Sequence, residues 1–68
     1  MEARNEEEFE SELAEALLEY AAQQDKDMIV STFEVNGVLT NNKGLVVQLG
    51  NGAEFQVTII QTMNAKEN

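Results

Sequence analysis

The residues of this 68-residue chain with the clearest chemical potential are four glutamates, which we call the glutamate row: Glu8, Glu12, Glu15 and Glu19. Their spacing of four, three and four positions places all four on one face of an α-helix. Paired carboxylates can act as acid and base, and a row of carboxylates can bind cations or a positively charged surface.

Catalysis by this row is not favoured. A general acid needs surroundings that keep its proton at neutral pH, and a solvent-facing row does not provide them. The chain has no His and no Cys, so the common catalytic triads and zinc sites lack their residues. The four glycines all fall at expected turns, which leaves no phosphate-binding loop. We therefore predict that the protein is not an enzyme and has no catalytic, cofactor-binding or metal-binding residue.

The row belongs to a segment with strong helix signals, which we predict to be helical over about residues 5–24. Asn5 is a favourable N-cap, and Glu8 three residues later completes a capping-box pattern. No Gly or Pro interrupts the segment, and good helix formers dominate it. An apolar stripe at helical spacing is expected to pack on the rest of the fold: Phe9, Leu13, Ala16, Leu17 and Tyr20.

After Gln24 the chain becomes rich in β-branched and aromatic residues, and three turn signals divide it at 36–37, 41–44 and 50–52. Strands are predicted over about 28–35, 37–41, 45–49 and 53–61, with a frayed tail over 63–68. Asn36–Gly37 fits either a tight hairpin or a bulge in one long strand. The shortness of the run that follows favours the bulge.

The apolar pattern predicts the strand register. A three-residue loop at 50–52 sets Val47 opposite Phe55, whereas a two-residue loop would set Gln48 against Phe55. Gly52 would then be left-handed. The same reasoning predicts a loop at 42–44 with Leu39 opposite Val47. One apolar sheet face results, which comprises Leu39, Leu45, Val47, Leu49, Phe55, Val57 and Ile59.

The predicted fold is therefore α+β: one N-terminal amphipathic helix packed on a three- to four-stranded antiparallel β-meander, as a single domain over 1–68.

The net charge of −9 is concentrated at one end, because residues 1–20 hold eight Glu and one Arg. This distribution argues against direct binding to nucleic acid or to an anionic membrane. The acidic N-terminus is unlike a secretion signal, and the absence of Cys suits a reducing compartment. We predict a cytoplasmic protein.

These observations predict a small acidic interaction protein that binds a basic protein surface and masks or inhibits it. The expected contact residues are the glutamate row, with Glu6, Glu7 and Glu10 in support. The row would otherwise be a solvated face that keeps the protein soluble. In size and concentrated acidity the chain is similar to phage-encoded inhibitors of host defence, the anti-CRISPR and anti-restriction proteins. That resemblance of class implies a mimic of nucleic acid.

Self-association is a further expectation. A chain this short buries only about 60% of its unfolded surface, and this one cannot form disulfides. A homo-oligomer is predicted, with a dimer favoured. The candidate self-association residues are Ser11, Ala14, Leu18 and Ala22 on the helix and Val38, Val46 and Ile60 on the sheet. The alternative function is a structural or assembly component that self-associates through sheet edges and apolar patches. A ligand-binding module is a third possibility, without positive support in the sequence.

Overall fold

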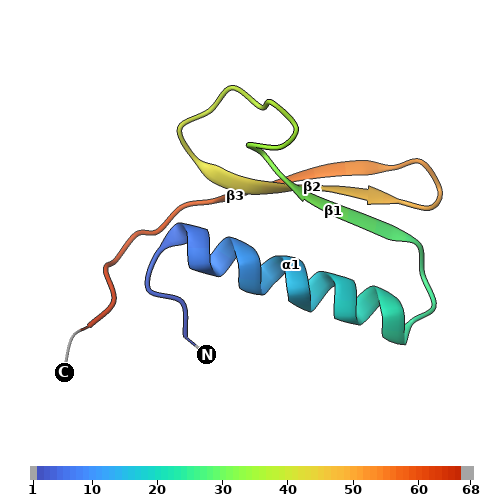
Figure 1. Cartoon of the computed structure of the whole chain (residues 1–68), viewed down its shortest axis with the longest axis horizontal. Coiled ribbons are helices and arrows are strands. Elements are labelled where there is room, and N and C mark those ends of the chain that lie inside the picture. The colour runs from blue at the N-terminus through green and yellow to red at the C-terminus, as the bar shows by residue number, and fades with distance from the viewer. Residues whose placement is uncertain (1, 67–68) are drawn as a thin grey trace.

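The computed structural model describes residues 2–66, which form one helix on a three-stranded antiparallel sheet (Figure 1). The elements are α1 (Glu6–Gln23), β1 (Met28–Thr32), β2 (Lys43–Leu49) and β3 (Glu54–Ile59). The strand order is β1-β2-β3, so β2 is central and β1 and β3 are the edges. The α+β prediction is confirmed. Residues 60–66 add no helix or strand, and residues 67–68 of the predicted frayed tail lie outside the described residues.

The start of α1 follows the prediction, because the Asn5 Oδ1 atom accepts a hydrogen bond of 2.9 Å from the Glu8 N–H. The helix ends in a Schellman motif. Lys26 N–H donates to the Ala21 carbonyl at 2.9 Å, and Asp25 N–H donates to the Ala22 carbonyl at 3.3 Å. Asp25 has a φ of 53°, which places an L-residue in the left-handed region where glycine is usual.

The β2–β3 hairpin also follows the prediction. Val47 pairs with Phe55 and Leu45 pairs with Val57. Leu49 N–H donates to the Ala53 carbonyl at 2.8 Å, and Gly52 has a φ of 91°. The three-residue loop and its left-handed glycine are therefore confirmed, and Leu45, Val47, Phe55 and Val57 lie on one face.

The segment between β1 and β2 differs from the prediction. No strand forms over 37–41, and β1 pairs directly with β2, with Val30 opposite Val47. Leu39, which was expected opposite Val47, is fully exposed at 101%. The predicted loop at 42–44 is wrong because Lys43 and Gly44 already belong to β2.

Asn36–Gly37 is neither a hairpin nor a bulge, because it closes a single helical turn. Thr32 begins that turn, since its Oγ1 atom accepts the Val35 N–H at 3.1 Å as an N-cap does. Gly37, with a φ of 69°, ends it, and Val38 N–H donates back to the Phe33 carbonyl at 3.0 Å. This is the second Schellman motif in the described chain.

The core extends to both faces of β2. Leu45 and Val47 point towards α1, and Val46 points to the other face because side chains alternate along a strand. The segment over 33–42 curls back on that other side of the sheet (Figure 1). Phe33 is 4% exposed, and its ring covers Gly44 so closely that a Cβ atom there would overlap it. The buried apolar residues are Ala21, Phe33, Leu45, Val46, Val47 and Ile59.

This packing changes the status of two predicted self-association residues. Val46 is only 3% exposed, so it belongs to the core and is not available at the surface. Val38 is half-buried, whereas Ile60 is 64% exposed.

Gly44→Ala should lower the free energy of unfolding by about 1–3 kcal/mol, because the added methyl group overlaps the Phe33 ring and also the backbone carbonyl of Val57. Urea denaturation in a double-mutant cycle with Phe33→Ala tests the cause. The Gly44→Ala penalty should shrink once the ring is gone. An equal penalty in both backgrounds would show that the ring is not responsible.

Asp25→Gly should raise the free energy of unfolding by about 0.5–1 kcal/mol, because glycine adopts the left-handed region without a Cβ penalty. Thermal unfolding would show this as an increase in Tm of a few degrees. Asp25→Ala is the matched control, since it also removes the charge but keeps a Cβ atom. Equal stabilisation by Ala and Gly would assign the effect to charge instead of backbone conformation.

Candidate functional site

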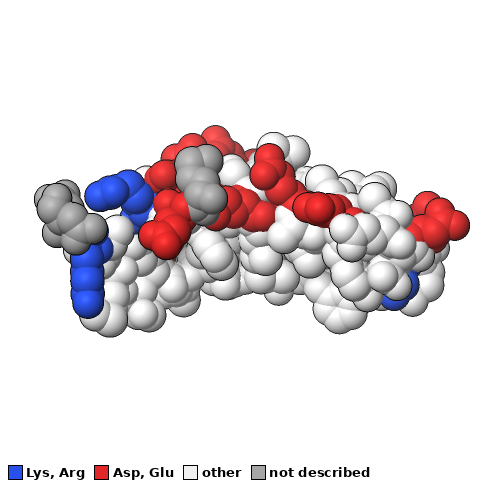
Figure 2. Space-filling model, turned by 90° about the horizontal axis from the view of Figure 1, so that it is seen from below, with Lys and Arg blue, Asp and Glu red and all other residues white. Residues whose placement is uncertain are grey.

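The glutamate row lies on the side of α1 that faces away from the sheet. Glu15 and Glu19 are exposed, and Glu8 and Glu12 are half-buried. At 1.5 Å per residue the row extends for about 16 Å. Figure 2, which views this side of the molecule, shows the acidic side chains as a band beside a broad uncharged area.

Few cations of the chain lie where they could neutralise the row. The ion pair found within residues 2–66 joins Lys43 Nζ to Glu34 Oε2 at 3.9 Å, away from the row. Lys26 Nζ lies 5.5 Å from the centroid of the Tyr20 ring. Arg4 contributes its backbone N–H to Glu8 Oε2, at 3.4 Å. The four carboxylates therefore present their charge outward.

Glu10 does not belong to this exposed acidic surface. It is 7% exposed, and its Oε2 atom accepts the Gly44 N–H at 2.9 Å. In a continuing ladder the Phe33 carbonyl would accept this N–H, because Phe33 N–H already donates to the Gly44 carbonyl at 3.0 Å. The Phe33 carbonyl instead accepts from Val38 at the Schellman turn. Glu10 supplies the missing acceptor, so we remove it from the proposed contact residues.

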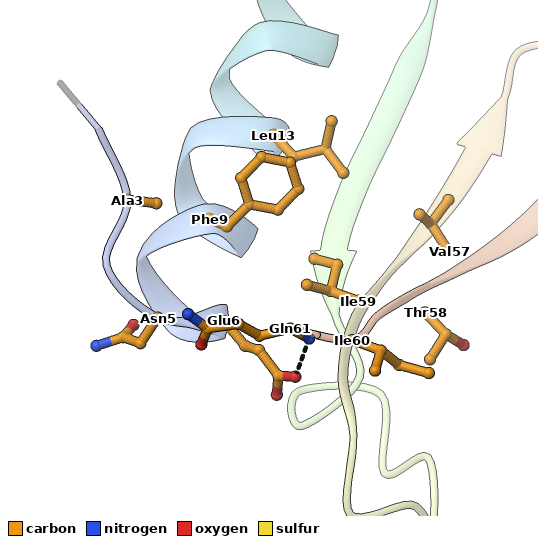
Figure 3. Close-up of a pocket in the computed structure, with 10 residues that line it drawn as sticks. All are labelled: Ala3, Asn5, Glu6, Phe9, Leu13, Val57, Thr58, Ile59, Ile60 and Gln61. Carbon is orange, nitrogen blue, oxygen red and sulfur yellow. Dashed lines mark hydrogen bonds between the residues drawn. The ribbon is translucent and has the colours of Figure 1, made fainter. Parts of the chain in front are cut away.

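Glu6 makes a similar contact one helical turn earlier. Its Oε2 atom accepts the Gln61 N–H at 2.6 Å, just after the end of β3 (Figure 3). Gln61 Nε2 in turn donates to the Arg4 carbonyl at 3.1 Å. Glu6 and Glu10 thus fasten the first half of α1 to backbone groups at one end of the sheet. Glu7 remains exposed, but at 100° per residue it lies about 100° around the helix from Glu8, on a neighbouring side.

The side of α1 that contacts the sheet differs from the predicted apolar stripe. Burial follows the residues at positions 10, 14, 17 and 21, of which Glu10 and Ala21 are the most buried. Phe9 and Tyr20 of the predicted stripe are 47% and 49% exposed. At 100° per residue the predicted stripe is rotated by about 85° from the sheet-facing side. Of the predicted small-residue face, Ala14 is half-buried, and three residues are exposed: Ser11, Leu18 and Ala22.

The predicted apolar stripe, which lies to one side of the sheet-facing residues, borders an apolar groove between α1 and β3 (Figure 3). Phe9 and Leu13 line it from the helix, and Val57 and Ile59 line it from the strand. Its volume is about 400 Å³. α1 packs on β1 and β2, so the same face of β3 is left partly uncovered, and Phe55 is 56% exposed.

Sequence reasoning missed this groove. One signal for it was present: residues 55–65 form the longest run without a charged residue in a chain of net charge −9. A run of that kind on an edge strand indicates a surface that contacts something apolar or another backbone edge.

Comparisons with protein-family models, with curated proteins and with solved structures found no match. The described part of the chain contains no helix with the length and apolar composition needed to cross a bilayer. Within residues 2–66, no group of three or more acidic side chains is arranged so that it could hold a metal ion. What the chain binds is therefore inferred from its own surfaces.

Glu10→Ala should lower the free energy of unfolding by about 1–3 kcal/mol, because it leaves the Gly44 N–H buried without an acceptor. Glu10→Gln should cost less, since an amide oxygen can still accept. Glu12→Ala, on the outer side of the same helix, is the control and should change stability by about 0.5 kcal/mol or less. Equal effects of the two Ala substitutions in urea denaturation would contradict the anchoring role of Glu10.

Proposed function

We propose that this protein is a non-enzymatic interaction protein that binds a basic protein surface through the outer side of α1 and thereby masks or inhibits it. The observation that carries the proposal is the outward glutamate row, which has no ion-pair partner within residues 2–66. Like charges at i and i+4 destabilise a helix by about 0.2–0.5 kcal/mol per pair. A cationic partner relieves that repulsion, whereas solvent alone only screens it.

The geometry of the row favours a partner that normally holds nucleic acid. The Cβ atoms of neighbouring members of the row stand about 5–6 Å apart along one line. A surface built from Lys and Arg to track a phosphate backbone presents positive charges along a similar line. Glu7, which is exposed in the first turn of α1, adds negative charge near the N-terminal end of the row. The row would compete with phosphates for such a surface, which is how a nucleic-acid mimic inhibits.

Replacing the row with four Glu→Gln changes should weaken binding to basic proteins by about fourfold to several hundredfold, since each exposed ion pair contributes about 0.2–1 kcal/mol. Capture from a lysate at low and moderate salt, followed by mass spectrometry, measures the loss. The matched control removes the same charge elsewhere, through Glu2→Gln, Asp25→Asn, Glu34→Gln and Glu54→Gln. If the row variant and the control variant lose the capture of basic proteins to the same extent, the row has only a solubilising role.

A second candidate function is a structural component that self-associates, and one observation favours it. Both outer strands of the sheet are edges, and β3 carries no charged residue after Glu54. Light scattering separates the two candidates, because a structural component should form large assemblies whereas an inhibitor should stay a small, defined oligomer.

A further inference from the structure

The outer edge of β3 presents backbone groups that do not face β2. Leu49 N–H donates to the Ala53 carbonyl, so the residues of β3 at 53, 55, 57 and 59 direct their backbone groups towards β2. Because the direction alternates along an antiparallel strand, the N–H and C=O groups of Gln56 and Thr58 point away from the sheet. They are ready to pair with another strand.

This edge lacks the features that usually prevent such pairing. Natural edge strands are protected by charged residues, by Pro or by bulges. Residues 55–65 contain no charge, the chain contains no Pro, and β3 pairs with β2 in continuous register. β1, the other edge, lies under α1 and is bordered by Asp27 and Glu34. β3 is therefore the edge open to a second strand.

We propose that β3 pairs antiparallel with β3 of a second copy of this chain, about a two-fold axis at Val57. The pairing joins two three-stranded sheets into one six-stranded sheet. Gln56 of each copy then exchanges backbone hydrogen bonds with Thr58 of the other. The occupant of the edge and of the groove beside it is thus a second copy.

The apolar pattern selects this register. With the axis at Val57, Val57 faces itself, and Phe55 of each copy faces Ile59 of the other, all on the α1 side. An axis at Gln56 would pair as many residues of β3, but it would bring the charged Glu54 of each copy into the paired segment, opposite Thr58 of the other. An axis at Thr58 would set Phe55 against Gln61, whose N–H is already bonded to Glu6. Val57 is the centre that pairs Phe55, Val57 and Ile59 on the α1 side and keeps Glu54 outside the paired segment.

Charge also favours a second copy at this edge over contact at other surfaces. Two chains of net charge −9 repel each other, so they can approach closely only where acids are absent. The uncharged β3 edge is such a surface, and the acidic band lies on the outer side of α1. With the axis at Val57, the two Glu54 residues fall at opposite ends of the paired strands.

The pairing also covers apolar surface that the single chain exposes. A two-fold axis perpendicular to the sheet keeps both helices on one face, so the two α1–β3 grooves adjoin at the axis. Phe9 and Phe55, which are 47% and 56% exposed, line or border these grooves. With only six buried apolar residues in the described chain, the added burial is a large share of the core.

Cysteine cross-linking tests the register directly, because the chain has no native Cys. Residues directly opposite in a pair without mutual hydrogen bonds have Cα atoms about 4.5 Å apart, which a disulfide can span. Val57→Cys should therefore form a linked dimer on mild oxidation. Ile29→Cys, on β1 and 63% exposed, is the control and should cross-link far less. Equal cross-linking of the two variants would overturn the proposal.

Thr58→Pro tests the role of the edge. The substitution removes an N–H that points away from the sheet. It does not remove any N–H group that donates a hydrogen bond between β2 and β3. Sedimentation should show a wild-type dimer of 7.6 kDa chains, and a Thr58→Pro monomer with the same circular dichroism spectrum. A wild-type monomer at millimolar concentration, or a dimer that Thr58→Pro leaves intact, would overturn the proposal. The variant with four Glu→Gln changes in the glutamate row should remain a dimer. This inference and the proposed function can therefore fail separately.

Discussion

The hydrogen bond from Gly44 N–H to the buried Glu10 carboxylate fixes how α1 lies on the sheet. Among the described residues, Glu10 is the one acidic or basic residue whose side chain is buried. A carboxylate is tolerated there only because it accepts a hydrogen bond. Together with the Glu6–Gln61 contact, it ties two points on one side of the helix to the starting end of β2 and the finishing end of β3. The rotation of α1 about its axis follows from those two contacts.

That rotation decides what every other side of the helix does. Ala14 and Ala21 lie towards the sheet, where small side chains allow close approach of the helix to β1 and β2. The glutamate row is thereby turned to the outside. The larger apolar residues, Phe9 and Tyr20, are displaced to the side and stay half exposed. In this orientation the Gly44 N–H at the end of the β1–β2 ladder has a hydrogen-bond acceptor, and apolar surface beside β3 stays uncovered.

The features that the sequence predicts correctly are those determined by residues close together in the chain. The Asn5 cap and the 50–52 loop depend on residues within a few positions of one another, and the sequence predicts both. The rotation of α1 depends on Glu10 meeting Gly44, which is 34 positions away and follows no period. Asn36–Gly37 fits several backbone forms, and the Thr32 cap and the packing of Phe33 on Gly44 select among them.

Charge and apolar surface end up on different sides of one helix, and this separation allows two associations of opposite electrostatic character. The proposed binding of a basic surface by the glutamate row would be attractive and would weaken as salt screens it. The proposed pairing of two β3 edges would bring together chains of like net charge, so salt would favour it. Both depend on Glu10 staying buried, because a rotation that released it would carry Phe9 under the sheet and turn the row away from the outer side.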